Sequence, residues 1–336
     1  MSEMRRDPLT KRWILCGSEY GIRQVTSFYN NEETNGQDPA ETEKLCPLCQ
    51  GNEYMTPPEI YAVRDEKSKW KVRVVPHRFP ILKIEGNLDL EGFGPYDMMN
   101  PIGAHEVVIE TPRHFDVIGN DQQYLVFKAI KDRTIDLMGD MRFKYIMIYK
   151  NKGKSAGSIL SHPHAQIIAL PFIPNEVANK LHTAQQYYDQ KERCIYCDLL
   201  KFEQKAGERM VYSNKHFIAI TPYASRFPFE IMIMPVKHNC NFISVTDEEL
   251  KSLAEIITVL REKLRKALST SNARYALYNS PVRFAKKGYW TTLESDYHWH
   301  IEFVPIITRE IGFEWASDFF VNPTIPEEAA RYLRDI

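Results

Sequence analysis

The sequence predicts an α+β protein made of two similar halves, each with a mainly antiparallel sheet and one long packed helix. A Cys-x-x-Cys pair occurs twice, at Cys46/Cys49 and Cys194/Cys197. A His-x-His triplet follows each pair far along the chain, and the segments in between come in the same order. Ordered self-similarity of this kind indicates an internal duplication. Strands in runs with few intervening helices favour antiparallel sheets.

Composition limits the classes of function that fit. A length of 336 residues suggests two domains. The 43 basic and 44 acidic residues give a net charge of -1, so no bulk field favours nucleic acid or an anionic membrane. No apolar run approaches the roughly 20 residues of a membrane span. Residues 1–10 lack the apolar core of a signal peptide. We therefore expect a cytoplasmic protein, in which Cys-x-x-Cys pairs favour metal or redox chemistry over disulfides.

In the first half, β-branched runs that end at prolines predict strands, and a helix lies between two of them. Asn120 with Gln123 three residues later is a variant of the capping box, so we expect this helix to begin there. Its apolar residues recur on one face as far as Met141. The expected strands are Trp13–Leu15, Val72–Val75, Glu106–Glu110, Tyr145–Tyr149 and the segment that begins at the His-x-His triplet.

The second half repeats this order. Thr246 and Glu249 form a capping box before an amphipathic helix that reaches Leu268. The expected strands are the hairpin Met210–Tyr212 and His216–Ile220, then Glu230–Met234, Tyr275–Tyr278 and the second triplet. Between the halves, residues 175–193 contain neither proline nor glycine and predict a helical linker. We therefore divide the chain into domains 1–176 and 194–336, joined by residues 177–193.

Each half contains the donors of a metal site. Two thiolates and two imidazoles are a common closed set for tetrahedral zinc. The first half offers Cys46, Cys49, His114 and one histidine of the pair His162/His164. The second half offers the same set, which is Cys194, Cys197, His238 and one histidine of the pair His298/His300. We predict two metal sites in similar positions of the repeat.

If His162 binds the metal, His164 remains as a plausible nucleophile or general base. The preceding loop, Asn151–Ser158, contains glycines and lysines that suit an anion, because backbone amides can converge there. Gln166 could donate to a phosphate oxygen. The alternative is an ordinary surface loop with solvated lysines.

With these residues in place, the chain resembles the galactose-1-phosphate uridylyltransferase family, a branch of the histidine-triad superfamily. The resemblance covers nearly the whole chain. It rests mainly on a His-Pro-His-x-Gln motif with a Cys-Pro-x-Cys motif upstream. The motifs that carry it are Arg6–Thr10, Cys46–Glu53, Val72–Pro80, Gly103–Val107, His162–Gln166 and Gly312–Glu314.

This resemblance implies two tandem histidine-triad-like domains and covalent catalysis. His164 would attack the α-phosphorus of a nucleotide sugar, and a sugar phosphate would then take the nucleotide from the histidine. His162 would bind zinc with Cys46, Cys49 and His114. Gln166, with Asn151, Gly157 and Ser158, would contact the phosphates. The nucleotide would lie near Arg78, Phe79 and Pro80, and Glu314 would bind sugar hydroxyls.

Some residues depart from the best-known transferases. Those enzymes build their second metal site with a linker Glu, where this chain has Lys180. The second Cys-x-x-Cys pair is closer to the ADP-glucose phosphorylase branch, which implies a second site made by Cys194, Cys197, His238 and His298. That site would hold zinc, with iron as the alternative. The loop before His300 lacks the Ser/Gly cradle, so we expect one active site per subunit, in a homodimer.

Three functions follow. The leading one is a nucleotidyltransferase that exchanges a nucleotide between UDP-glucose and galactose 1-phosphate by a ping-pong mechanism. The second is an ADP-glucose or dinucleoside-polyphosphate phosphorylase that uses inorganic phosphate. The third is a zinc protein that only binds nucleotides, although binding alone would not need His164.

Overall fold

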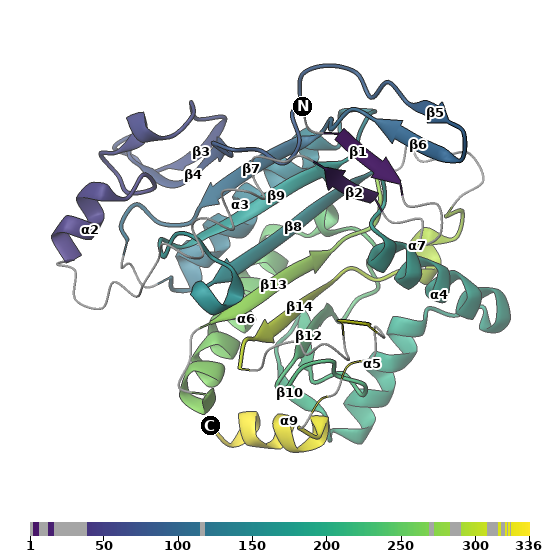
Figure 1. Cartoon of the computed structure of the whole chain (residues 1–336). Helices are drawn as coiled ribbons and strands as arrows, with labels where there is room; N and C mark the ends of the chain where they lie inside the picture. The colour runs from purple at the N-terminus through teal and green to yellow at the C-terminus, as the bar shows by residue number, and fades with distance from the viewer. Residues whose placement is uncertain are drawn as a thin grey trace.

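One antiparallel sheet of ten strands runs through the molecule (Figure 1). The computed structural model describes residues 3–6, 13–16, 39–114, 118–268, 272–282, 290–307, 315–316, 320, 322 and 324–336. The strand order is β10-β11-β12-β14-β13-β8-β9-β7-β4-β3. The bounds of these strands are β3 Tyr61–Arg64, β4 Trp70–Pro76, β7 Ala104–Ile109, β8 Tyr145–Lys152, β9 His164–Leu170, β10 Met210–Ser213, β11 Phe217–Ile220, β12 Ile231–Pro235, β13 Ala273–Tyr278 and β14 His300–Pro305.

The two halves of the sheet have equivalent strand orders when each is followed from its outer edge toward the middle. The order β3-β4-β7-β9-β8 in one half corresponds to β10-β11-β12-β14-β13 in the other. The halves meet where β8 pairs with β13, with Tyr149 opposite Ala276. The sequence predicts a sheet for each half, and the structure adds that the two half-sheets join edge to edge. This junction leaves neither β8 nor β13 as an exposed edge strand.

Two long helices cover one face of the sheet across both halves. They are α3 (Asn120–Leu137) and α6 (Asp247–Leu268). Both pack into one shared core, to which β4, β7, β8 and β9 of the first half and β11 to β14 of the second contribute. Burial of this continuous apolar layer is the main favourable term that holds the halves together.

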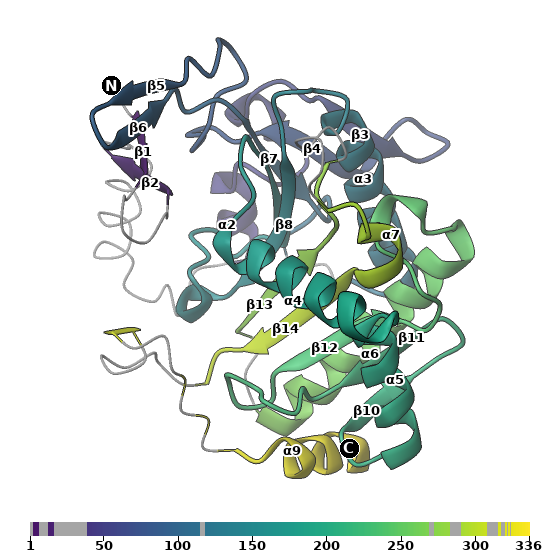
Figure 2. The ribbon, with the colours of Figure 1, turned by 90° about the vertical axis from the view of Figure 1, so that its right-hand side faces the viewer.

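The opposite face is covered differently in each half. In the second half it carries α4 (Asn175–Lys191), α5 (Ile195–Ala206) and the short α7 (Leu293–Asp296), as Figure 2 shows from the side. In the first half the segment around Cys46 and Cys49 packs on β4 and β7. Other helices in the part of the chain that the structure describes are α2 (Pro39–Leu45), α9 (Pro326–Asp335) and the 3-10 turns η1 (Glu53–Met55), η2 (Lys154–Ala156) and η3 (Phe242–Ser244).

A separate four-stranded sheet has the order β2-β1-β6-β5. Its strands are β1 (Glu3–Arg6), β2 (Trp13–Cys16), β5 (Glu91–Phe93) and β6 (Tyr96–Met99). It pairs the start of the chain with a hairpin that lies almost a hundred residues later, as Met4 opposite Met99 shows.

The two capping predictions have different outcomes. The box at Thr246 and Glu249 is confirmed, because the Thr246 amide donates to the Glu249 carboxylate at 2.8 Å and the Glu249 amide donates to Thr246 Oγ1 at 3.3 Å. The box at Asn120 is wrong, since Gly119 occupies the N-cap position without a side-chain bond and Asn120 is already helical. Within the described segments, every helix is too short or too polar to span a lipid bilayer.

Candidate active site

The first cluster of cysteines and histidines assembles from three distant segments. Cys46, Cys49, His114 and His162 place their donor atoms within 4.8 Å of one another. His162 Nδ1 lies 3.6 Å from Cys46 Sγ and 3.5 Å from Cys49 Sγ. His114 Nδ1 lies 3.8 Å from Cys49 Sγ. All four residues are buried.

The second cluster repeats this arrangement with Cys194, Cys197, His238 and His298. Cys197 Sγ lies 3.3 Å from His238 Nδ1 and 3.8 Å from His298 Nδ1. The two imidazoles meet edge to face with centroids 5.2 Å apart, as His114 and His162 do. His298, not His300, completes this group.

Hydrogen bonds to the outer ring nitrogens prepare three of these histidines as ligands. A backbone carbonyl only accepts, so the bonds from Nε2 of His162 to Thr111 (2.9 Å), of His238 to Glu294 (2.9 Å) and of His298 to Pro235 (3.0 Å) require a proton on each Nε2. Each Nδ1 then turns a lone pair toward the thiols. This pattern is typical of metal-bound histidines, and the donor set fits zinc.

Burial disfavours the ionised form of the cysteine thiols. It raises the pKa of Cys49, which also lies beside Cys46, to about 12, and burial raises the pKa of Cys194 to about 12. Both thiols therefore stay protonated at neutral pH in the metal-free protein. A metal ion that binds here must displace those protons, which couples metal affinity to pH.

His164 begins β9 and points one ring nitrogen at an acceptor. Its Nδ1 lies 2.7 Å from the carbonyl of His162, so Nδ1 carries the proton and Nε2 carries the lone pair. Among the described residues, none forms a hydrogen bond to that Nε2. Burial lowers the pKa of His164, which favours the neutral ring. The result is a neutral imidazole whose Nε2 lone pair has no hydrogen-bond partner among the described residues.

A cavity of about 270 Å³ lies beside this histidine. His164 and Gln166 line it from β9, and Pro47 and Leu48 line it from the first Cys-x-x-Cys segment. His77, Arg78 and Phe79 line another wall, whereas Pro80, a predicted contact, does not. The Arg78 guanidinium carbon lies 5.5 Å from the Phe79 ring centroid. A flat apolar group beside an exposed guanidinium suits a nucleotide base and its phosphates.

The loop between β8 and His164 does not present the converging amides that we expect. The amides of Ala156 and Ser158 both donate to the carbonyl of Gly153, and the Gly157 amide donates to Lys154. These three amides are therefore hydrogen-bonded within the loop. Asn151 and Ser158 instead line a second cavity, of about 660 Å³, which His164 also borders, while Gly157 lines the smaller one. The side chains of Asn151 and Ser158 are therefore the candidate phosphate contacts of this loop.

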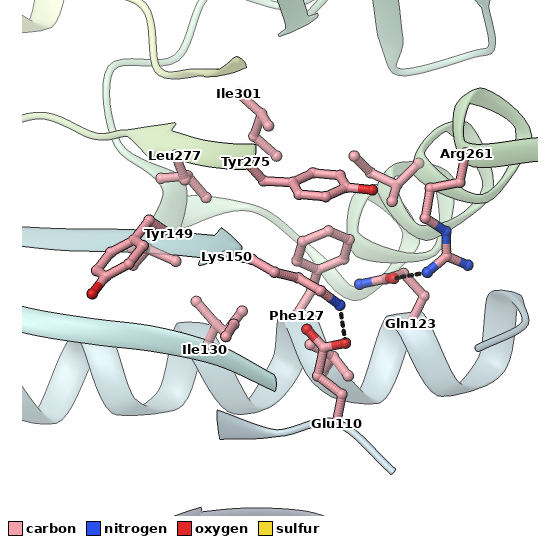
Figure 3. A pocket seen from close by; sticks show the side chains of 14 residues that line it. Glu110, Gln123, Phe127, Ile130, Tyr149, Lys150, Arg261, Tyr275, Leu277 and Ile301 are labelled. Atoms are coloured by element: carbon pink, nitrogen blue, oxygen red, sulfur yellow. Dashed lines mark hydrogen bonds and ion pairs between the residues drawn. The ribbon is translucent and has the colours of Figure 1, made fainter. Parts of the chain in front are cut away.

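Sequence reasoning missed a buried ion pair behind this loop. Lys150 of β8 pairs with Glu110, and Arg261 of α6 donates to Gln123 Oε1 at 3.2 Å (Figure 3). These groups border a cavity of about 60 Å³ between the sheet and the long helices, whose other lining residues are apolar apart from Tyr149 and Tyr275. No local motif predicts the pair, because Glu110 follows β7 and Lys150 lies forty residues later in β8. Glu314, the predicted sugar contact, lies outside the described residues.

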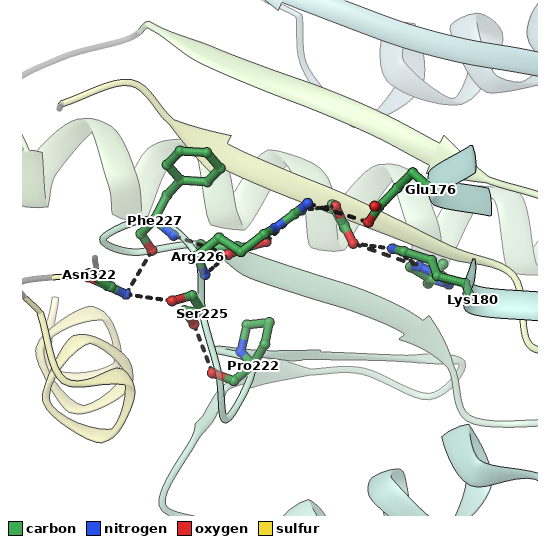
Figure 4. Close-up of polar contacts among 10 residues, drawn as sticks. Glu176, Lys180, Pro222, Ser225, Arg226, Phe227 and Asn322 are labelled. Carbon is green, nitrogen blue, oxygen red and sulfur yellow. Dashed lines mark hydrogen bonds and ion pairs between the residues drawn. The ribbon is translucent and has the colours of Figure 1, made fainter. Parts of the chain in front are cut away.

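The second half has the same fold at the equivalent position, but both ring nitrogens of its histidine, His300, already have partners. His300 Nδ1 lies 3.0 Å from the carbonyl of His298, the same bond that His164 makes. Its Nε2, however, lies 3.1 Å from Lys180 Nζ of α4. An ammonium can only donate, so the lone pair of His300 is already engaged. Lys180 and Arg226 also bind Glu302, at the position of Gln166 in the repeat (Figure 4).

Fold and site together define an α+β protein with two Cys₂His₂ clusters and, two residues after His162, a histidine whose Nε2 is unpaired among the described residues. The family model for the N-terminal domain of galactose-1-phosphate uridyl transferase matches residues 1–174, and the model for its C-terminal domain matches residues 180–317. The chain belongs to the galactose-1-phosphate uridyl transferase family, which is a family of nucleotidyltransferase enzymes.

Individual relatives fall into two groups. A galactose-1-phosphate uridylyltransferase from Thermotoga maritima is 30% identical over 345 residues, which cover 100% of this chain and 98% of the relative. An ADP-glucose phosphorylase from Arabidopsis thaliana is 29% identical over 344 residues, which cover 99% and 93%. The crystal structure of an ADP-glucose phosphorylase from Arabidopsis thaliana with bound ADP-glucose matches with a TM-score of 0.77 and 26% identity, covering 100% of this chain and 99% of that one.

Proposed function

We propose that this enzyme exchanges a nucleoside monophosphate between a nucleotide sugar and hexose 1-phosphate, with UDP-glucose and galactose 1-phosphate as the pair. The observation that carries the proposal is the state of His164. Its Nδ1 is tied to a carbonyl, and its Nε2 has no partner among the described residues beside a cavity that also contains Gln166. Sequence identity to the Thermotoga maritima transferase supports the choice of substrates.

The reaction balances in two in-line steps. Nε2 of His164 attacks the α-phosphorus, the bond from phosphorus to the bridging oxygen breaks, and hexose 1-phosphate leaves with the electron pair. The ring keeps its Nδ1 proton and becomes cationic, a charge that the carbonyl of His162 stabilises at 2.7 Å. A phosphate oxygen of the acceptor then attacks phosphorus, the P–N bond breaks, and His164 returns to its neutral form.

We propose zinc at both Cys₂His₂ clusters, with iron as the alternative for the second. The first cluster would hold His162, whose carbonyl orients His164, so this metal would shape the active site without touching substrate. The second would fasten α5 to the loops before β14 and after β12. A closed set of four protein ligands is typical of structural metal.

A phosphorylase that uses inorganic phosphate is the second candidate. The observation in its favour is that the second cluster assembles in the structure. The Cys-x-x-Cys pair of this cluster resembles the ADP-glucose phosphorylase branch more than it resembles the best-known transferases. Identity to the Arabidopsis thaliana phosphorylase adds support. Both candidates share the covalent step and differ in base and acceptor.

Covalent labelling tests the proposal. We expect UDP-glucose labelled with ³²P at the α-phosphate to label the protein, and galactose 1-phosphate to release the label. Label from ADP-glucose that phosphate releases would select the phosphorylase instead. His164→Gly should remove labelling while metal content and thermal stability stay unchanged. Labelling that persists in this variant would overturn the mechanism, and no label in the wild type would leave a nucleotide-binding protein.

We further propose that the enzyme is a cytoplasmic homodimer. The hairpin of β5 and β6 supports the oligomer, because it exposes Phe93 (78%) and Tyr96 (53%) next to Leu90 (69%). Apolar side chains gathered on one hairpin favour a protein contact. The molar mass in solution, measured by light scattering, tests the dimer, and a monomeric value at micromolar concentration would reject it.

A further inference from the structure

The carboxamide of Gln166 is held by two donors on neighbouring strands. Its Oε1 lies 2.8 Å from Nε2 of His105 on β7 and 2.7 Å from the hydroxyl of Tyr149 on β8. Gln166 sits between these strands on β9, and it lines the cavity next to His164. No described residue accepts a hydrogen bond from its Nε2. The carboxamide oxygen is therefore hydrogen-bonded to the protein, and the NH₂ group remains available on the side of the cavity.

A backbone contact decides which nitrogen of His105 carries the proton. The amide of Ile81 donates to His105 Nδ1 at 3.2 Å, so Nδ1 holds the lone pair. Nε2 then carries the proton and donates to Gln166. The Tyr149 hydroxyl donates to the same oxygen. Both lone pairs of Oε1 are thereby used, and the amide group of Gln166 must take the other side.

We propose that His105 and Tyr149 are positioning residues that fix the rotamer of the Gln166 carboxamide, so that its NH₂ group always donates to the nucleotide phosphate. This inference rests on the proposed function. A carboxamide turned by 180° would place a carbonyl oxygen against an anionic phosphate and repel it. With both donors present, the site is preorganised for the charge of the phosphoryl group and does not reorganise during reaction.

The surroundings of His105 keep this arrangement intact. The ring is 3% exposed and stacks on His77, with centroids 4.1 Å apart and planes 6° apart. Burial and the neighbouring His77 lower the pKa of His105 to about 3, so the ring stays neutral over the working range of pH. A protonated ring would set its Nδ1 proton against the Ile81 amide. The packing thus supports the tautomer that the hydrogen bonds require.

The second half provides an internal contrast. Strand pairing places Ala276 opposite Glu302, as it places Tyr149 opposite Gln166. Ala276 has no group to donate, and a carboxylate at 302 has no NH₂ to orient. The half in which the histidine lone pair is blocked by Lys180 therefore also lacks the tyrosine and the glutamine. The tyrosine and glutamine pair thus lies in the same half as the histidine whose Nε2 is unpaired among the described residues.

A mutant cycle on the rate of labelling tests the inference. The variants are Tyr149→Phe, His105→Phe and their double, each made in the wild type and in Gln166→Ala, and the readout is the single-turnover rate of nucleotidyl-enzyme formation. We expect each single change to slow labelling by roughly tenfold, the effect of weakening one charge-assisted hydrogen bond, with little change in KM. The double variant should approach the rate of Gln166→Ala. Tyr212→Phe, whose hydroxyl binds Glu255 far from the site, is the matched control.

The Gln166→Ala background distinguishes positioning from general structural damage. There, neither change should alter the rate by more than about twofold, since no carboxamide remains to be oriented. Equal losses in both backgrounds would overturn the inference while the proposed function stands. If the wild type is not labelled at all, the proposed function fails. The same cycle is then measured as the Kd for UDP-glucose and ADP-glucose, and additive effects on Kd again reject positioning.

Discussion

Two histidines in equivalent positions of the repeat differ by a single contact, at the ring nitrogen that the proposed mechanism requires to be free. His164 and His300 both donate from Nδ1 to the carbonyl two residues earlier, at 2.7 and 3.0 Å. They differ at Nε2, which is open in His164 and faces Lys180 at 3.1 Å in His300. Full burial of His300 lowers its pKa to about 3. The difference comes from the side chain of Lys180 on α4, not from the strand that His300 begins.

The ion pairs around His300 predict a pH-dependent contribution to stability. Burial alone would raise the pKa of Glu302, but the charges of Lys180 and Arg226 outweigh it and hold the pKa at about 2, against 4.5 for an ordinary Glu. A lowered folded pKa adds stability that is complete above about pH 4.5 and is lost as the pH falls through about 2. Glu302→Gln should therefore cost about 3 kcal/mol at pH 7 and almost nothing at pH 2.

Urea denaturation of both proteins between pH 2 and 7 checks this expectation. Metal bound at either cluster would dissociate from both proteins in acid, so only the difference in the free energy of unfolding between them is compared. A difference that stays constant over this range would show that Glu302 is not ionised through its ion pairs.

Gly153 predicts a steric effect at the loop before His164. Its φ is +84°, and a Cβ there would lie 1.7 Å from Asn272 Oδ1. We expect Gly153→Ala to lower the free energy of unfolding by about 2–4 kcal/mol, through backbone strain and overpacking. Gly92→Ala, where a Cβ meets nothing within 4 Å, is the control and should change stability by less than about 0.5 kcal/mol. Equal thermal denaturation midpoints for the two variants would contradict this.

At the scale of elements, the two Cys-x-x-Cys segments join parts that strand pairing does not connect. The first links the segment after α2 to the start of β9 through His162, and the second links the start of α5 to the loop before β14. Each cluster therefore fastens a peripheral segment to one half of the sheet. Metal that holds such a cluster would contribute free energy of binding directly to folding.

Removal of one ligand gives a stoichiometric prediction. We expect two metal ions per chain in the wild type and one in Cys49→Ser or Cys197→Ser, measured by elemental analysis. Each variant should also unfold at a lower temperature and bind no further metal on refolding. Cys240→Ser, which belongs to neither cluster, should keep both ions. A full complement of metal in Cys49→Ser would remove the first cluster from consideration.

At the scale of the whole molecule, the two halves share one ten-stranded sheet and one large core. Because β8 pairs with β13 and because α3 and α6 pack together, neither half can unfold without exposing apolar surface of the other. Cooperative unfolding as a single unit follows from this arrangement, although the sequence divides into two repeats.

Hydrogen exchange tests this cooperativity. Leu253→Ala leaves a cavity under α6 in the second half and should cost about 3 kcal/mol. We expect reduced protection in β4, β7 and β9 of the first half as well as in β12 and β14. Met141→Ala, at an exposed position outside the β5–β6 hairpin, should leave protection unchanged. A loss confined to second-half peptides would mean that the halves open independently.

Local pattern was sufficient for much of the fold and part of the site. The duplication, most strands and the Thr246 capping box were predictable, because periodicity and spacing act within a few residues. Spacing left open which histidine of each His-x-His pair joins the cysteines, and the family resemblance selected His162 and His298. The capping box at Asn120 failed because Gly119 takes the N-cap position, a choice of one residue that pattern does not resolve. The amides of Ala156, Gly157 and Ser158 do not contribute to the expected cradle, because they donate to carbonyls within the loop.

What the chain encodes locally is a repeated strand-and-helix plan with two sets of soft ligands and a candidate nucleophile. What depends on folding is which distant groups meet. The joining of two half-sheets at β8 and β13, the two donors on Gln166 and the ammonium of Lys180 on His300 all involve residues far apart in sequence. Spacing along a chain carries no information about register between remote strands. A hydrogen bond of about 3 Å exists only after packing has placed both partners.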